Sequence, residues 1–252
     1  MSDSPRPFAE TADIDTASDD YATRFAGPVG RWFLERQRDI TLELARPWTG
    51  GRVLEVGGGH AQLAPAMAAA GFAVTVTGSD DSCRRRLDAA MAPGDFTYRT
   101  CDSLNLPWPD DSFEVVMAFR LLPHVRRWPA LLAEMCRVAS GAVILDYPDL
   151  RGFNYFSERL FTAKMAIEKN TRAFQCFRRR QVLEQLAVHG FGQAALRPQF
   201  FWPMALHRAV GSAGFSRAAE ALARGLGLTA LLGSPVIVRA RNLAAGRPGE
   251  RE

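Results

Sequence analysis

Residues 53–64 read VLEVGGGHAQLA, and this stretch decides the fold class. Apolar residues lead directly into Gly57, Gly58 and Gly59, and small and apolar residues follow with helical spacing. Such a pattern predicts a buried strand, a tight turn with bare backbone, and then a helix. A turn of this kind leaves room for a pyrophosphate, for a nucleoside, or for no ligand at all.

Strand and helix patterns alternate along the chain on both sides of this turn. Strands are predicted at 52–56, 73–77, 96–99, 115–119 and 142–147, and helices at 62–70, 82–91 and 129–138. Later in the chain, strands are predicted at 196–201 and 236–239, helices at 157–170 and 179–189, and an apolar helical stretch at 204–232. Because apolar strands alternate with helices, an α/β fold with a largely parallel sheet covered on both faces is expected.

The composition narrows the class of protein. The chain has 252 residues, of which 47% are hydrophobic, and a net charge of +4. Its arginine runs, 84–86, 126–127 and 178–180, are short and typical of solvated helix faces, so nucleic-acid binding is not expected. The apolar stretch 225–238 is broken by Gly233 and Pro235, so firm membrane anchoring is not expected either.

The four cysteines lie far apart in the sequence and form no CxxC pair. Together with an N-terminus that has no apolar leader, this predicts free thiols, a cytoplasmic location and no metal site. Residues 1–20 are polar and acidic and are expected to form a disordered tail. Residues 21–252 are expected to form a single domain, and its first helix ends before Pro47.

The glycine turn fits one ligand motif better than another. A dinucleotide fingerprint, G-x-G-x-x-G, would place its third glycine where Gln62 stands. The alternative, acidic-x-G-x-G-x-small, is matched by Glu55, Gly57, Gly59 and Ala61. This pattern resembles the first motif of the class I S-adenosylmethionine-dependent methyltransferases. No lysine or arginine stands near the turn and Glu55 would repel an anion, so an adenosyl group is expected rather than a pyrophosphate.

Further matches follow in the same order as in that family. Residues 106–116, LPWPDDSFEVV, are similar to a segment that precedes and enters the fourth strand of these enzymes. The resemblance runs from about residue 53 to residue 145 and is greatest to the subgroup that includes ubiquinone and menaquinone biosynthesis methyltransferases, of the methyltransferase type 11 kind. It implies a Rossmann-like seven-stranded sheet, an added N-terminal helix and C-terminal lid, and S-adenosyl-L-methionine as cofactor. The core motifs lie within residues 50–147.

The resemblance also assigns residues to the cofactor. Asp80 stands where the family's acid holds the ribose, and Asp81 or Ser82 is expected to cap the helix that follows. Asp102 stands where an aspartate accepts from the adenine amino group, beside a backbone contact at Ser103. The expected cofactor-binding set is Tyr21, Glu55, Gly57, Gly58, Gly59, Asp80, Asp81, Asp102, Ser103 and Arg120. In this set Tyr21 acts as a lid, and Arg120 lies at the cofactor's amino group with a side chain that could bind a carboxylate of cofactor or acceptor.

Three residues are candidates for chemistry on the acceptor. His124 follows the fourth predicted strand and could act as a general base, or be a structural histidine of the loop. Tyr147 and Asp149 end the fifth predicted strand, at the edge where ligands collect in open α/β sheets, although they could also form an ordinary turn. His60, within the glycine turn, is expected to meet solvent or the edge of the cofactor.

The acceptor pocket is expected to come from segments outside the core motifs, at 21–48, 150–178 and 199–232. Their many aromatic residues favour an apolar or aromatic small molecule, with methylation at oxygen, nitrogen or carbon left open. The alternatives are a methyltransferase that acts on RNA or protein, and a fold of this kind that binds the cofactor without transferring methyl. A homodimer is compatible with the sequence.

Overall fold

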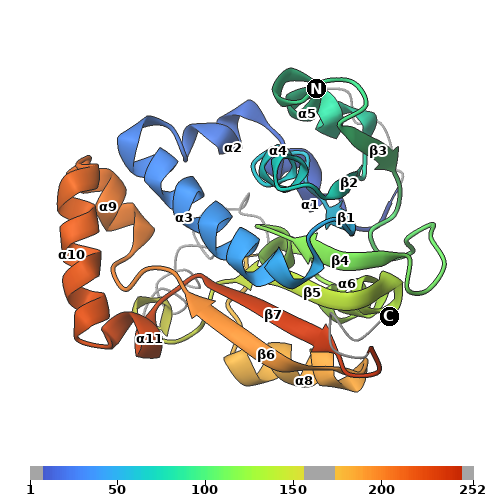
Figure 1. Ribbon diagram of the computed structural model, residues 1–252. Coiled ribbons are helices and arrows are strands. Elements are labelled where there is room, and N and C mark those ends of the chain that lie inside the picture. The colour runs from blue at the N-terminus through green and yellow to red at the C-terminus, as the bar shows by residue number, and fades with distance from the viewer. Residues whose placement is uncertain (1–7, 156–173, 246–252) are drawn as a thin grey trace.

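A seven-stranded sheet forms the centre of the computed structural model, which describes residues 8–155 and 174–245 (Figure 1). Its strands are β1 Arg52–Val56, β2 Ala73–Gly78, β3 Phe96–Thr100, β4 Phe113–Ala118, β5 Ala139–Tyr147, β6 Phe191–Pro198 and β7 Val236–Asn242. They lie in the order β3-β2-β1-β4-β5-β7-β6, and only β7 runs antiparallel to its neighbours within this sheet. The predicted α/β fold with a Rossmann-like sheet is therefore confirmed.

Helices cover both faces of the sheet (Figure 1). One face carries α3 Gly27–Ala45, α4 Ala64–Ala69 and α5 Arg85–Ala90, and the other carries α6 Trp128–Val138 and α8 Arg179–Val188. The helices α9 Met204–Val210, α10 Ala213–Gly225 and α11 Leu228–Leu232 form a separate group, and α9 and α10 contact α3. No helix in the described parts of the chain is long and apolar enough to cross a membrane.

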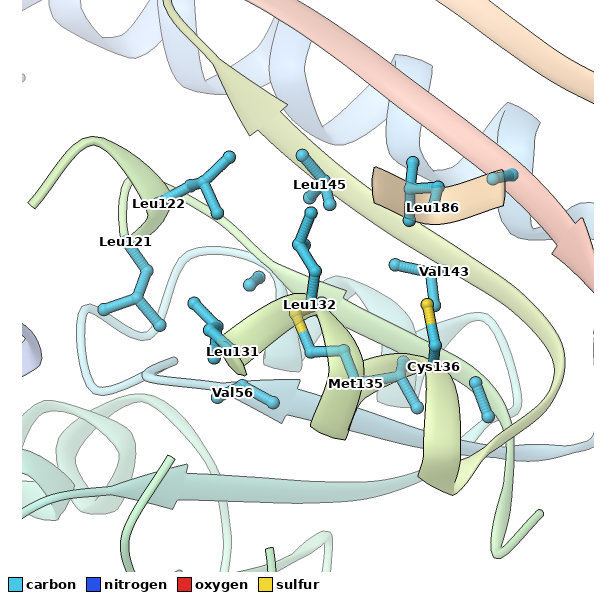
Figure 2. Close-up of a cluster of buried hydrophobic side chains, with 14 of the residues drawn as sticks. Val56, Leu121, Leu122, Leu131, Leu132, Met135, Cys136, Val143, Leu145 and Leu186 are labelled. Atoms are coloured by element: carbon cyan, nitrogen blue, oxygen red, sulfur yellow. The ribbon is translucent and has the colours of Figure 1, made fainter. Parts of the chain in front are cut away.

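Neighbouring residues of each central strand enter opposite cores. Val53 and Ile144 pack with α3 and α4, whereas Leu54 and Leu145 pack with α6 and α8. Figure 2 shows Leu132 and Met135 of α6 close to β5 in the second of these cores. Because successive side chains of a strand point to opposite faces, a strand buried on both faces must be apolar throughout, as the sequence pattern requires.

Several strand and helix boundaries differ from the predictions. The sixth strand runs over Phe191–Pro198 rather than 196–201, because it pairs with β7 from Phe191 onward and Phe200 leaves the sheet to pack in an aromatic cluster with Trp32. The helix predicted at 82–91 is a short 3-10 helix, η2 Asp81–Arg84, followed by α5. The helix predicted at 157–170 lies outside the described residues.

The expected disordered tail at 1–20 is wrong for its described part, residues 8–20. These residues include α1 Ala12–Thr16 and the start of α2 Asp19–Thr23. Asp13 is only 5% exposed, and Glu10 accepts a hydrogen bond of 2.9 Å from the backbone N–H of Arg127. The acidic side chains that suggested disorder instead satisfy donors of the folded domain, which offsets the cost of burying them.

Candidate functional site

The turn after β1 requires glycine because of what surrounds it. Gly57 has φ +69°, and a Cβ atom placed there would lie 2.9 Å from a methyl carbon of Leu121. A Cβ atom at Gly58 would lie 2.6 Å from the carboxyl carbon of Glu55. Gly57 and Gly58 are therefore required by the close packing of this turn against Leu121 and the buried Glu55.

Two buried titratable groups lie beneath the turn. Glu55 and His60 have 3.7 Å between Oε1 and Nε2, and among the described residues none of their side-chain polar atoms has a hydrogen-bond partner. Burial raises the pKa of Glu55 to about 8, although the nearby positive charge of Arg120 opposes this rise. Burial also lowers the pKa of His60 well below its usual value, so the ring is neutral at pH 7. The expectation that His60 meets solvent is wrong, because it is 3% exposed.

Residues at the tip of β2 are held by local hydrogen bonds. Asp80 accepts a 2.8 Å hydrogen bond from the backbone N–H of Ser82. Hydrogen bonding from the Ser82 side chain, and after it from the Ser82 backbone, lowers the pKa of Asp80. The cap of η2 is thus Asp80, not Asp81 or Ser82 as expected. Asp81 accepts instead from the hydroxyl of Thr100. The Asp80 side chain remains near the surface, where it can still reach a ligand.

The loop after β3 brings two more expected residues toward the glycine turn. Asp102 accepts a 2.9 Å hydrogen bond from the backbone N–H of Leu104, which is the bond of an ordinary aspartate turn. Ser103 lines a small hollow with Gly57 and Ser79. Asp102 therefore stabilises this loop, and the hydrogen bond from Leu104 occupies one of its two carboxylate oxygens.

Residues of α1 fill the space above the carboxyl ends of β1 and β2. Asp13 accepts hydrogen bonds from the N–H and from the hydroxyl of Ser79, at 2.5 and 2.6 Å. A Cβ atom added at Gly57 would lie 3.3 Å from the Cβ of Asp13, and one added at Gly59 would lie 3.0 Å from the Cβ of Ala17. The hollow left between these elements measures only about 10 Å³. A nucleoside cannot enter this space unless α1 moves.

A second group of polar residues lies at the ends of β4 and β5. The backbone N–H of Arg120 donates to Asp146 Oδ1 at 2.6 Å, and Gln37 of α3 donates to Asp146 Oδ2 at 3.2 Å. Burial raises the pKa of Asp146 to about 6. The Arg120 guanidinium lies 5.7 Å from the ring centre of Tyr21 and 4.6 Å from that of Phe25. Its positive charge is thus covered by aromatic rings of the N-terminal segment.

These residues border a pocket of about 380 Å³. Its walls come from the loop after β4, from the end of β5, from α2 and α3, and from the segment before and within α9. The aromatic members of the lining are Tyr21, Phe25, Phe33, Phe153, Phe174, Phe200, Phe201 and Trp202. Glu220 of α10 fixes part of this wall, because it accepts hydrogen bonds from the backbone N–H groups of Phe201 and Trp202 and lies 3.1 Å from His207.

The comparisons with known proteins agree with this geometry. A family model described as a methyltransferase domain matches residues 31–216. The chain belongs to the methyltransferase family. An uncharacterized methyltransferase of Mycobacterium marinum is 33% identical to this methyltransferase domain over 127 residues, which are 49% of the chain and 50% of the relative. The chain thus spans about half the length of the curated relatives it matches.

Solved structures share the fold of this methyltransferase domain. Magnesium protoporphyrin IX methyltransferase of Synechocystis PCC 6803, solved with bound SAH, has a TM-score of 0.59 and 15% identity, and the match covers 90% of this chain and 97% of that one. A Thermotoga maritima SAM-dependent methyltransferase, described as a possible histamine N-methyltransferase, has a TM-score of 0.55 and 16% identity over 84% and 93% of the two chains. The family, the fold and S-adenosylmethionine as the cofactor of the family are confirmed. The ubiquinone and menaquinone subgroup stays a prediction.

The methyltransferase domain brings some predicted acceptor residues together and separates others. His124 lines the pocket with Tyr21 and Arg120. Tyr147 and Asp149 do not line it: Tyr147 is fully buried against Phe177, with ring centres 6.3 Å apart, and Asp149 is fully buried. Asp149 makes ion pairs with Arg151 and Arg179 and lines a neighbouring cavity of about 740 Å³. A catalytic role for Tyr147 or Asp149 stays a prediction.

Three polar residues of the site were missed by sequence reasoning. Gln37 stands on the apolar face of α3, between Phe33 and Leu44, and a polar residue at such a core position is a signal that could have marked it. Asp13 and Gln199 carry no comparable signal, because their roles depend on contacts far along the chain. No group of three or more metal-ligating side chains is found in residues 8–155 and 174–245.

Proposed function

We propose that this chain transfers a methyl group from S-adenosylmethionine to an apolar or aromatic small molecule. The observation that carries the proposal is the pocket of about 380 Å³ that opens at the ends of β4 and β5 and is lined mainly by rings and apolar side chains. Its size suits a small molecule and its lining suits an apolar one. The acceptor-binding elements are then 21–48 and 199–232, with the described part of 150–178.

The residues around the glycine turn fit the cofactor. The carboxyl group of Glu55 has no hydrogen-bond partner among the described residues, so it can accept from an ammonium group. Gly57, Gly58 and Gly59 carry no side chains where a nucleoside would lie once α1 has moved. In this proposal Asp80 accepts from the ribose hydroxyls, with Asp81 beside it. Asp102 and Ser103 meet the adenine, the backbone of Arg120 meets the amino group, and Tyr21 closes over the site.

The remaining work of the protein is to align the acceptor and exclude water. When bound, the cofactor supplies an activated methyl group on a sulfonium sulfur. Holding two reactants in line can supply roughly 7–11 kcal/mol of a barrier, and the aromatic lining keeps water from competing. His124, in the pocket wall beside Phe174, is the residue proposed to take a proton from a hydroxyl acceptor.

A macromolecular acceptor is a weaker alternative. Two of the three arginine runs are partly neutralised: Arg84 pairs with Asp88, Arg85 and Arg86 both pair with Asp19, and Arg180 pairs with Glu184. Such pairing lowers the positive potential that an RNA surface needs. A cytoplasmic location and a homodimer stay predictions.

The proposal is tested by two measurements on the full chain. Calorimetry with S-adenosylhomocysteine measures cofactor binding. Methyl transfer is measured as the S-adenosylhomocysteine that is released when the chain is given S-adenosylmethionine and each of a panel of aromatic small molecules. Binding together with acceptor-dependent release supports the proposal. Binding without release for any acceptor would favour a cofactor-binding protein that transfers no methyl, and release only with RNA or protein would favour the macromolecular alternative.

A further inference from the structure

Arg120 carries a buried guanidinium that makes no hydrogen bond to the part of the chain that the structure describes. The residue is 8% exposed, and none of its three side-chain nitrogens has a partner among the described residues. The charges of two acids, Asp146 and Glu55, act on Arg120, but neither acid is hydrogen-bonded to its guanidinium. Asp146 accepts instead from the backbone N–H of Arg120 and from the side chain of Gln37. Leaving a buried charge unpaired is costly, so a site of this kind is expected to have a ligand that pairs with it.

The backbone holds Arg120 in an unfavourable conformation at this place. Its φ is +55°, in the left-handed region that residues with a Cβ seldom adopt, and the short bond from its N–H to Asp146 fixes it there. Strained backbone of this kind is found at sites where a side chain must be held in one direction. Here the strain holds the guanidinium in the wall of the pocket.

Two further arginines give the pocket lining a positive net charge. Arg24 and Arg208 line it together with Arg120, and Asp146 is the one acidic residue among its described lining residues. Gln199, which is 1% exposed, has a side-chain Nε2 with no hydrogen-bond partner among the described residues and lines the same pocket. Three arginines, one unpaired amide donor and many rings match an anion carried on an apolar body.

We propose that the acceptor of this methyltransferase carries a carboxylate on an apolar or aromatic body, and that the Arg120 guanidinium binds that carboxylate. The inference rests on the proposed function and names the chemical class of its acceptor. A guanidinium and a carboxylate match in a planar, two-bond geometry. This class of acceptor places the apolar body against Phe200 and Trp202 and the acid group at the end of β4.

The aromatic rings over Arg120 do not prevent this pairing. In the structure the guanidinium faces the rings of Tyr21 and Phe25, both on the N-terminal segment. Such cation–π contacts are weaker than a charge-assisted, two-bond pair with a carboxylate. Exchanging a ring for the carboxylate is therefore favourable, and it moves the same segment that covers the glycine turn.

A ligand series on the unaltered chain tests the inference first. Benzoate, trans-cinnamate and 2-naphthoate are compared with their carboxamides, which keep the shape but carry no charge. Binding is followed by calorimetry and by the tryptophan fluorescence of the chain, to which Trp202 of the pocket lining contributes. We expect at least one acid to bind about 10- to 100-fold more tightly than its amide, as for hydrogen bonds to charged groups. Equal binding of every acid and its amide, or no binding of any acid, would overturn the inference.

Variants then identify the residue responsible. Arg120→Gln is expected to abolish the preference for acid over amide, Arg120→Lys to retain part of it, and Arg31→Gln, an exposed arginine of α3 outside the pocket, to retain all of it. Circular dichroism checks that each variant is folded. If Arg120→Gln does not fold, the inference is judged from the acid-over-amide preference of Arg120→Lys and of the unaltered chain. An unchanged preference in a folded Arg120→Gln variant would overturn the assignment.

Binding of S-adenosylhomocysteine separates this inference from the proposed function. We expect the control Arg31→Gln to bind it within about threefold of the unaltered chain. If Arg120→Gln loses S-adenosylhomocysteine and keeps its preference for acids, Arg120 serves the cofactor and the inference is wrong. If the unaltered chain binds acids through Arg120 but never binds S-adenosylhomocysteine, the proposed function fails while the acid site stands.

Discussion

Asp13 and Ser79 are joined by two hydrogen bonds, from the backbone N–H and from the hydroxyl of Ser79, at 2.5 and 2.6 Å. Asp13 belongs to α1 and Ser79 immediately follows β2, directly before the acid expected to hold the ribose. A carboxylate of the protein thus lies beside the position proposed for the cofactor's sugar. The N-terminal segment and the cofactor therefore compete for the same space.

Weakening this contact is expected to improve cofactor binding. Asp13→Asn replaces a charged acceptor by a neutral amide, and hydrogen bonds to charged groups contribute about 1.5–3 kcal/mol each. We expect S-adenosylhomocysteine to bind up to about tenfold more tightly, with faster association in stopped-flow measurements, because α1 is displaced more easily. The control is Asp20→Asn, an exposed residue of α2. Weaker binding in Asp13→Asn would show that Asp13 helps to hold the cofactor.

The two roles of Asp80 can be separated by two substitutions. Asp80→Asn keeps a side chain that caps η2 as well as aspartate does, whereas Asp80→Ala removes the cap, at a cost of about 0.5–2 kcal/mol. Both offer fewer acceptors to a ribose diol than a carboxylate does. We expect both variants to bind S-adenosylhomocysteine at least tenfold more weakly, and only Asp80→Ala to melt at a lower temperature.

A matched control for Asp80 is Asp88→Asn, a nearby surface acid that pairs with Arg84. It should change neither affinity nor melting temperature. Affinity that is unaltered in both Asp80 variants would remove this residue from the cofactor site, although its capping role would remain.

Glu55 predicts a stability that falls as pH rises. The pKa of the folded carboxyl is about 8, above the ordinary value of 4.5, because burial disfavours the charged form. Between these two pH values the folded chain binds more protons than the unfolded chain, so the free energy of unfolding decreases as pH rises through this window. Asp146, with a pKa raised to about 6, acts in the same direction over a narrower window.

Glu55→Gln therefore should stabilise the chain at pH 8 and leave it nearly unchanged at pH 4. The expected gain at pH 8 is a few kcal/mol at most, measured by thermal melting across pH. Above pH 8, where Glu55 of the unaltered chain is ionised, the same variant should bind S-adenosylmethionine more weakly, because a neutral amide replaces the carboxylate proposed to meet the ammonium group. A gain in stability with a loss of binding is typical of functional residues. A variant that melts lower than the unaltered chain at pH 8 would contradict the buried, proton-holding role of Glu55.

Local patterns predicted the sheet and the position of the glycine turn, because strand burial and turn chemistry depend on neighbouring residues. Asp13 and Gln37 could not be placed in the same way. Asp13 meets a donor 66 residues away and Gln37 meets Asp146 109 residues away, so both contacts exist only once the chain is folded. The prediction for residues 8–20 was wrong because it was based on their acidic composition alone. Composition does not show which hydrogen-bond donors the acidic side chains contact in the folded chain.

His124 and Asp149, two residues expected to be catalytic from sequence, should respond differently to substitution. Asp149 is fully buried and lies 3.0 Å from Arg179 and 3.3 Å from Arg151. Asp149→Asn should lower the free energy of unfolding by about 2 kcal/mol, because buried charge pairs lose more when one partner is removed than surface pairs do. The folded fraction should keep kcat within about twofold.

His124→Ala should show the opposite behaviour, since the ring lines the pocket and packs 5.7 Å from Phe174 without entering the core. For a hydroxyl acceptor we expect kcat to fall about 100-fold and to lose its rise with pH, as general-base catalysis contributes about 100- to 10,000-fold. The melting temperature should change little. The measurement is the pH dependence of S-adenosylhomocysteine release by the unaltered chain, by His124→Ala and by His124→Gln, which keeps a polar side chain but accepts no proton. If His124→Ala retains full kcat at every pH, the acceptor transfers its proton without this residue, and His124 contributes only to the shape of the pocket.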